Sequence, residues 1–159
     1  MFTSKVRIKK LEPFRAASFH AYGTQPEIEA LAKLENWAKS KGFTGEPARN
    51  RVFGFNNPSP SPGTPNYGYE VWMVIGQEVQ PEGDVEIINF PGGLYGVLFW
   101  DGHGDPNESI PLAWKELVLW REQSPYQSAN HQWLEEHLKP GEDSQVEFTL
   151  DLYLPIAEG

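Results

Sequence analysis

The feature that most constrains this fold is an internal duplication. Residues 6–23 (VRIKKLEPFRAASFHAYG) and 85–102 (VEIINFPGGLYGVLFWDG) both begin with alternating apolar side chains, break, continue as a second β-rich run and end in glycine, and they align without a gap. A helical segment and two strand-like segments follow each stretch, and the last strands align best with Glu70 on Asp151. Order, spacing and element type all repeat, so we favour duplication over chance similarity. We expect one domain over residues 1–159, with two β-β-α-β-β copies over approximately 6–77 and 85–157.

Each copy carries one predicted amphipathic helix. In the first copy, Thr24 with Glu27 has the pattern of a capping box. In the second copy, either Asp105 or Ser109 could cap the helix. Pro111 favours the later start, because proline is tolerated only in the first turn of a helix.

Two strands are predicted after each helix. They cover residues 51–57 and 67–76 in the first copy and residues 130–138 and 145–156 in the second. A connection rich in Pro, Ser and Gly, residues 56–66, joins the strands of the first copy. We expect it to be a stiff connection, and a lid over a binding site is the alternative.

Charge and composition exclude several classes of function. The chain has 13 Lys and Arg against 22 Asp and Glu, a net charge of −9, so duplex DNA binding is not expected. It has no Cys, and therefore no disulfide, thiolate nucleophile or cysteine metal site. The absence of Cys is compatible with a cytoplasmic location, and no signal peptide or membrane-spanning segment is recognisable. The aromatic content, six Trp, six Tyr and nine Phe, can line a pocket for a flat apolar ligand.

Three predicted strands place a carboxylate and an aromatic side chain on one face, because residues i and i+2 of a strand point the same way. These groups are Glu70 with Trp72, Glu135 with Trp133 and His137, and Asp151 with Tyr153. If the three faces converge, they form an aromatic cavity with carboxylates in its wall, which favours a flat organic cation. A sheet with one solvated face is the structural alternative, but it does not explain the accompanying Trp and Tyr.

Three motifs, in this order, resemble the GyrI-like small-molecule-binding domain, the effector-binding domain that is fused to AraC- and MerR-type regulators and also occurs alone. They are FPGGLYGVL at 90–98, LEEHL at 134–138 and LDLYLPI at 150–156, and the resemblance covers nearly the whole chain. It implies an α+β fold of two strand-helix-strand-strand modules related by a pseudo-twofold axis. It also implies an antiparallel sheet, two main helices and a ligand cleft between the modules.

The resemblance further implies a buried glutamate, in the strand after the second helix, that meets cationic lipophilic drugs. Glu135 is the best match, and Glu136 takes its place if the register slips by one residue. Together with the acids and aromatics chosen by strand face, the expected ligand-binding residues are Glu135, Glu70, Trp72, Trp133, Tyr153, Tyr95, Phe99 and His137.

The sequence therefore favours a standalone module that binds lipophilic aromatic cations without a cofactor or metal ion, for sequestration or sensing. A GyrI-like hydrolase of reactive small molecules is the first alternative, with Glu135 and Glu70 as its acid pair. No GxSxG, HExxH or Walker A motif supports catalysis. His103 with Asp101 and Asp105 fits a turn better than a metal site.

The second alternative is a protein-interaction role such as gyrase modulation, because the family takes its name from inhibition of DNA gyrase. No helix-turn-helix with a basic recognition helix is present, so direct binding to nucleic acid is not expected. A regulatory protein partner stays open. A homodimer stays open as well, since an exposed strand edge would allow two chains to pair.

Overall fold

The computed structural model describes residues 5–42, 51–80, 83, 85–102, 104–138 and 148–159. Its contacts divide the chain into two compact units. The first unit is Phe14–Phe90, and the second unit combines Met1–Pro13 with Pro91–Gly159. Each unit is an antiparallel sheet with one main helix, so the expected α+β class is confirmed.

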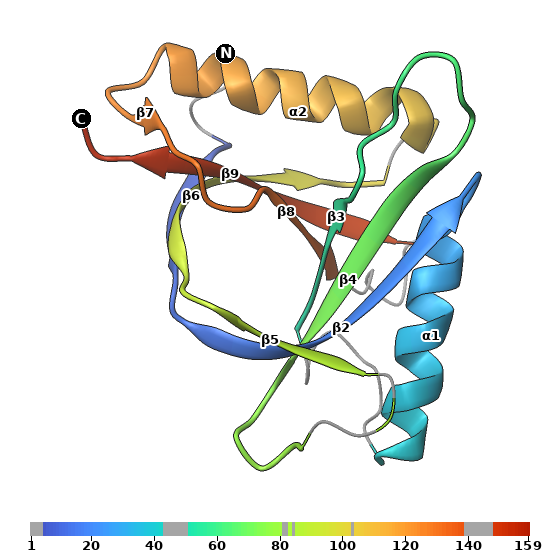
Figure 1. Cartoon of the computed structure of the whole chain (residues 1–159). Helices are drawn as coiled ribbons and strands as arrows, with labels where there is room; N and C mark the ends of the chain where they lie inside the picture. Colours follow the sequence, from blue (N-terminus) through green and yellow to red (C-terminus); the bar gives the residue numbers. More distant parts are fainter. Residues whose placement is uncertain (1–4, 43–50, 81–82, 84, 103, 139–147) are drawn as a thin grey trace. The chain divides into compact units, whose positions relative to one another are not determined.

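The sheet of the first unit has the strand order β5-β2-β4-β3. Its strands are β2 (Phe14–Gly23), β3 (Val52–Asn56), β4 (Tyr67–Ile75) and β5 (Glu86–Phe90). Helix α1 (Pro26–Ser40) packs on β2 and β4 (Figure 1). The buried side chains Ala30, Leu34 and Ala38 of α1 form a core with Val71 and Met73 of β4. This core occupies one face of the sheet and leaves the opposite face to other residues.

The sheet of the second unit has the corresponding order β1-β6-β9-β8. Its strands are β1 (Arg7–Leu11), β6 (Gly93–Trp100), β8 (Leu134–Leu138) and β9 (Thr149–Ala157), and the short β7 (Gln127–Ser128) also pairs with β9. Helix α2 (Pro106–Glu122) packs on β6 and β9 (Figure 1). Its buried Leu117 and Trp120 form a core with Leu150, Leu152 and Leu154.

The two compact units exchange the first strand of each sequence repeat. β1, from the first repeat, pairs with β6, and β5, from the second repeat, pairs with β2. Arg7 lies opposite Val97 and Glu86 lies opposite Ser18. These two pairs are equivalent, because the repeat alignment sets Arg7 on Glu86 and Ser18 on Val97. Each four-stranded sheet is therefore completed by a strand from the other repeat.

The start of α1 differs from the sequence prediction. The N-cap residue is Gln25 and makes no side-chain capping bond, so the capping box of Thr24 and Glu27 was wrong. Glu27 instead accepts a hydrogen bond from the Tyr67 hydroxyl, at 2.6 and 2.7 Å from its two oxygens. The Glu27 side chain, which would have completed the capping box, is therefore bound to Tyr67 of β4.

The later start predicted for α2 was also wrong. The helix begins at Pro106, and Asp105 caps it by accepting a hydrogen bond from the backbone N–H of Asn107 at 3.0 Å. Pro111 lies inside the helix. The Ser109 hydroxyl accepts a hydrogen bond from Trp100 Nε1 at 3.0 Å, so it packs the helix onto β6 instead of capping it.

The remaining elements lie near their predicted positions. β8 starts at Leu134, so Trp133 precedes the strand, and residues 145–147 of the last predicted strand lie outside the described residues.

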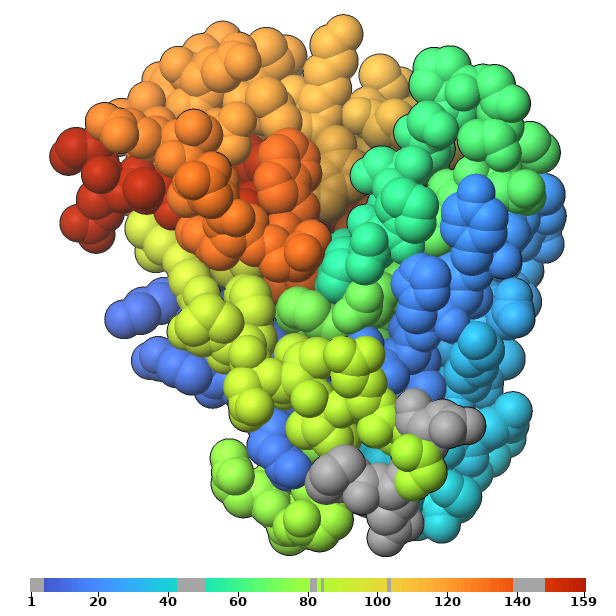
Figure 2. Space-filling view, viewed as in Figure 1, coloured from blue at the N-terminus to red at the C-terminus, as the bar shows by residue number. Residues whose placement is uncertain are grey.

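The connection between β3 and β4 is exposed from residue 57 to residue 65 and lies on the surface of the first unit (Figure 2). His103 lies outside the described residues, so the structure does not bear on that candidate metal site.

The packing of α2 on β6 gives a stability prediction at Gly96. A Cβ atom at this position would lie 2.5 Å from Cζ3 of Trp120, so a Gly96→Ala substitution would displace a buried ring. We expect it to lower the free energy of unfolding by about 1–3 kcal/mol in urea titrations. Gly23→Ala is the matched control, because a Cβ atom there meets nothing within 4 Å. Equal effects of the two substitutions would contradict the packing explanation.

Candidate functional site

An aromatic cluster covers the face of the first unit's sheet that α1 leaves free. Its members come from four strands and are Phe14, Phe53, Phe55, Trp72 and Phe90. The ring centroids of Phe55 and Trp72 lie 4.9 Å apart, those of Trp72 and Phe90 5.5 Å, and those of Phe14 and Phe53 5.5 Å. Strand alternation places this cluster on the face opposite Val71 and Met73, which pack against α1.

Glu70 is the carboxylate of this aromatic face. Its Oε2 accepts hydrogen bonds from Trp72 Nε1 at 2.7 Å and from the Ser18 hydroxyl at 2.8 Å, and its Oε1 accepts one from Asn57 Nδ2 at 3.0 Å. All three donors are neutral. In the part of the chain that the structure describes, no Lys, Arg or His forms an ion pair with Glu70. The neighbouring indole is therefore one of the donors that allow a carboxylate to occupy an apolar strand.

Cross-strand neighbours extend this group towards solvent. His20 and Phe55 lie directly opposite Glu70 on β2 and β3. His20 Nε2 lies 2.6 Å from the backbone oxygen of Asn57, on the exposed side of the group. Sequence analysis did not identify Ser18 or Asn57 as neighbours of Glu70. Ser18 could have been identified only from the antiparallel register of β2 on β4, because that register sets Ser18 opposite Trp72.

The corresponding face of the second unit carries Glu136, Tyr153 and Tyr95. Glu136 is 6% exposed and accepts a hydrogen bond from the Tyr153 hydroxyl at 2.7 Å. The rings of Tyr153 and Tyr95 meet edge to face at 5.3 Å. Tyr95 donates its hydroxyl proton to the backbone oxygen of Gln132 at 2.5 Å, and burial raises the pKa of Tyr95 above its usual value. This face also contains Asp151, which forms an ion pair with Arg7 at 2.5 Å.

Glu135 lies on the other face of the same sheet. It pairs with Leu152, which packs under α2, whereas Glu136 pairs with Asp151. Trp114 of α2 donates from Nε1 to Glu135 Oε2 at 3.3 Å, and its ring lies 5.3 Å from that of Trp133. Glu135 with Trp133 and Tyr153 with Asp151 were expected on converging faces. The structure places them on opposite faces of the sheet, because the register of β8 on β9 sets Glu135 opposite Leu152 and Glu136 opposite Asp151.

The predicted site residues therefore divide into three groups. Glu70 and Trp72 lie together in the first unit. Tyr95 and Tyr153 lie with Glu136 on one face of the second unit, and Glu135, Trp133 and His137 follow the other face. Phe99 pairs with Asp151 but is 50% exposed. Trp114 was not predicted, since only the packing of α2 brings it to Glu135.

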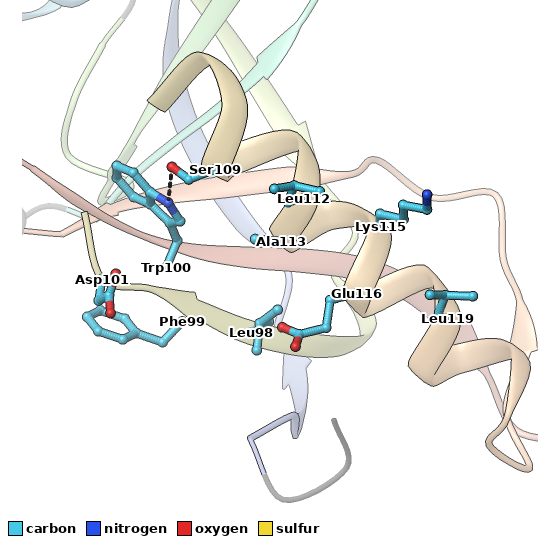
Figure 3. A pocket seen from close by; sticks show the side chains of 10 residues that line it. All are labelled: Leu98, Phe99, Trp100, Asp101, Ser109, Leu112, Ala113, Lys115, Glu116 and Leu119. Atoms are coloured by element: carbon cyan, nitrogen blue, oxygen red, sulfur yellow. Dashed lines mark hydrogen bonds between the residues drawn. The ribbon is translucent and has the colours of Figure 1, made fainter. Parts of the chain in front are cut away.

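A separate pocket of about 410 Å³ lies between α2 and the end of β6 (Figure 3). Four consecutive residues from the end of β6 and just after it, Leu98 to Asp101, line one wall. Leu112 and Lys115 are among the α2 residues on the opposite wall. None of the glutamates discussed above lines this pocket.

Two further properties can be stated for the described residues. They contain no group of three or more His, Asp or Glu side chains arranged to hold a metal ion. They also contain no helix with the length and apolar character needed to cross a membrane.

The Tyr153 hydroxyl gives a test of the buried Glu136 carboxylate. Tyr153→Phe removes the donor at 2.7 Å and leaves a buried acceptor without that bond, which we expect to lower the free energy of unfolding by about 1–3 kcal/mol. Chemical denaturation measures this loss. Tyr22→Phe is the control, because Tyr22 is 54% exposed, and a loss of the same size there would contradict the assignment.

His137 gives a test by pH. Burial lowers the pKa of His137 to about 4, and the charge of Glu136 opposes part of this shift. In the unfolded chain His137 takes up a proton near pH 6.5, whereas in the folded chain it does so only near pH 4. The contribution of His137 to the free energy of unfolding is therefore fully present above pH 6.5 and is lost as the pH falls towards 4. Between pH 7 and 4.5 we expect wild type to lose about 2 kcal/mol more stability than His137→Gln. Parallel losses in the two proteins would contradict the lowered pKa of His137.

The fold matches several solved structures at low sequence identity. The C-terminal domain of EcmrR superposes with a TM-score of 0.68 at 15% identity, covering 97% of this chain and 98% of that chain. A hydrolase from Listeria innocua matches with a TM-score of 0.66 at 11% identity, covering 96% and 92%. SAV2435 bound to tetraphenylphosphonium matches with a TM-score of 0.52 at 11% identity, covering 96% and 93%. No curated protein matches the chain.

The family comparison covers almost the whole sequence. Residues 4–157 match the family described as the GyrI-like small molecule binding domain. This span includes both compact units, with the Glu70 and the Glu136 clusters. The chain belongs to the GyrI-like family of small-molecule-binding domains.

Proposed function

We propose that this chain binds lipophilic aromatic small molecules that carry a positive charge, and that Glu70 is the carboxylate that meets this charge. The observation that carries the proposal is the surroundings of Glu70: three neutral hydrogen-bond donors and an aromatic cluster. The donors fix the position of the carboxylate, but they add no positive charge of their own.

Physical chemistry favours a flat cation at such a place. Phe55 and Trp72 are within ring contact of each other and lie on the face of Glu70, and they are only 9% and 7% exposed. A cation that reaches their rings would therefore meet a desolvated aromatic surface and a carboxylate together. A cation over an aromatic ring gains about 0.5–1 kcal/mol when exposed and about 2 kcal/mol when desolvated. The net charge of −9 adds a long-range attraction of the same sign.

Glu136 is the second carboxylate that we propose for ligand binding. It lies on the equivalent face of the second unit, where Tyr153 holds it and Tyr95 contacts Tyr153. Glu135, the best match from sequence, contacts Trp114 on the α2 side and serves as the comparison variant. The binding is proposed to need no cofactor or metal ion, and to serve sequestration or sensing in the cytoplasm.

Proteins of similar fold support the proposed class of ligand and the proposed type of role. SAV2435 has been solved with tetraphenylphosphonium, a lipophilic aromatic cation. EcmrR carries its similar domain as a C-terminal domain, which is consistent with a regulatory protein partner for this chain. The hydrolase from Listeria innocua favours one second candidate, turnover of a reactive small molecule. In that case Glu70 would position or activate a water molecule beside the aromatic cluster.

A matched panel of ligands tests the proposal. Tetraphenylphosphonium, neutral triphenylphosphine oxide and anionic tetraphenylborate would be titrated against the protein, with tryptophan fluorescence and calorimetry as readouts. We expect saturable binding of the phosphonium ion only, and about tenfold weaker binding in Glu70→Gln. Glu136→Gln tests whether the carboxylate on the Tyr153 face of the second unit contributes to affinity. Glu135→Gln tests the same for the carboxylate on the α2 face.

The control variant is Glu35→Gln, which removes the same charge from an exposed position of α1. We expect its affinity to equal that of wild type. Equal binding of all three ligands would reject the cation proposal. Unchanged phosphonium affinity in both Glu70→Gln and Glu136→Gln would reject these carboxylates. Release of a product would favour the hydrolase.

A further inference from the structure

Glu70 has one hydrogen-bond acceptor position that none of the described residues uses. A carboxylate has about four lone-pair positions on its two oxygens. Trp72 and Ser18 both donate to Oε2, and Asn57 donates to Oε1. One position on Oε1 is therefore available to a donor from outside this network.

The available position lies on the accessible side of the carboxylate. The two donors to Oε2 are buried, since Trp72 and Ser18 are each 7% exposed. Asn57, which donates to Oε1, is exposed, and so is His20 beside it. A molecule that approaches Glu70 from solvent consequently meets Oε1 before Oε2.

The carboxylate is held in one orientation. Both donors to Oε2 stand on paired strands, Ser18 on β2 and Trp72 on β4. Asn57 is held in turn, because its backbone N–H donates to the backbone oxygen of Gly68 at 2.8 Å and its own backbone oxygen lies 2.6 Å from His20 Nε2. Since Glu70 is already fixed, an incoming donor does not bear the cost of ordering it.

We propose that Oε1 of Glu70 accepts a hydrogen bond from the N–H of a protonated amine. The ligands of this chain are accordingly protonated primary, secondary or tertiary amines that carry an aromatic group, in preference to permanently quaternary cations. This inference rests on the proposed function and specifies the chemical class of its ligand.

Replacement of water explains the preference. Without ligand, a water molecule can satisfy the exposed Oε1 position. A protonated amine that displaces this water restores the hydrogen bond in charge-assisted form, whereas a methyl group of a quaternary ion leaves the acceptor unsatisfied. Charge and aromatic group are the same for both ions. The change in their affinity difference between wild type and Glu70→Gln isolates the hydrogen bond from the different hydration of the two ions.

A ligand pair that differs by one methyl group tests the inference. N,N-dimethyl-(naphthalen-2-ylmethyl)amine, protonated at pH 7, would be compared with trimethyl-(naphthalen-2-ylmethyl)ammonium by calorimetry. We expect wild type to bind the tertiary ammonium about tenfold more tightly. The preference should disappear in Glu70→Gln and persist in Glu35→Gln.

The outcomes separate this inference from the proposed function. Equal affinities in wild type, or tighter binding of the quaternary ion, would overturn the hydrogen bond and leave cation binding intact. A preference that persists in folded Glu70→Gln would also overturn it, because another acceptor would then be responsible. Failure of both ions to bind would reject the proposed function and this inference together. Equal affinities in wild type overturn the inference even if Glu70→Gln does not fold.

Discussion

The two-faced character of the β-sheet is the constraint on which the rest of the structure depends. In each unit one helix buries one face of the sheet, so every second strand residue is committed to a core such as Val71 and Met73 or Leu152 and Leu154. Any acid at the intervening positions must lie on the opposite face and find donors there. Glu70 and Glu136 both do so, one with an indole and one with a phenol. An aromatic side chain on these faces can thus stabilise a carboxylate and also offer a surface to a cation.

The duplication made much of the fold predictable. The repeat alignment reappears in the strand registers, where Ala16 pairs with Val74 as the equivalent Tyr95 pairs with Pro155. The sequence could not reveal that β1 and β5 are exchanged between the units, because pairing partners are set by the whole sheet. Helix starts failed for a related reason, since Glu27 and Ser109 found tertiary partners that local capping rules do not include.

The candidate site was only partly predictable. In WLEEHL two acids stand side by side, so alternation alone does not determine which one follows the core face. The pairing of β8 with β9 decides it, setting Glu136 opposite Asp151 and Glu135 opposite Leu152. In β4 a single acid stands among apolar residues, and the shared face of Glu70 and Trp72 could be predicted. Their partner Ser18 is 52 residues from Glu70 and could not be assigned before the register was known.

The repeats differ most at the carboxylates themselves. Glu70 and Asp151 occupy equivalent positions in the aligned repeats, and so do Arg7 and Glu86. In the second unit the exchanged strand β1 brings Arg7 to Asp151 and neutralises it. In the first unit the exchanged strand β5 brings Glu86 to the corresponding place, opposite Ser18. The same exchange therefore gives an ion pair in one unit and places an acid instead of a cation at the equivalent position of the other. This difference is consistent with the proposal that Glu70 meets an external cation.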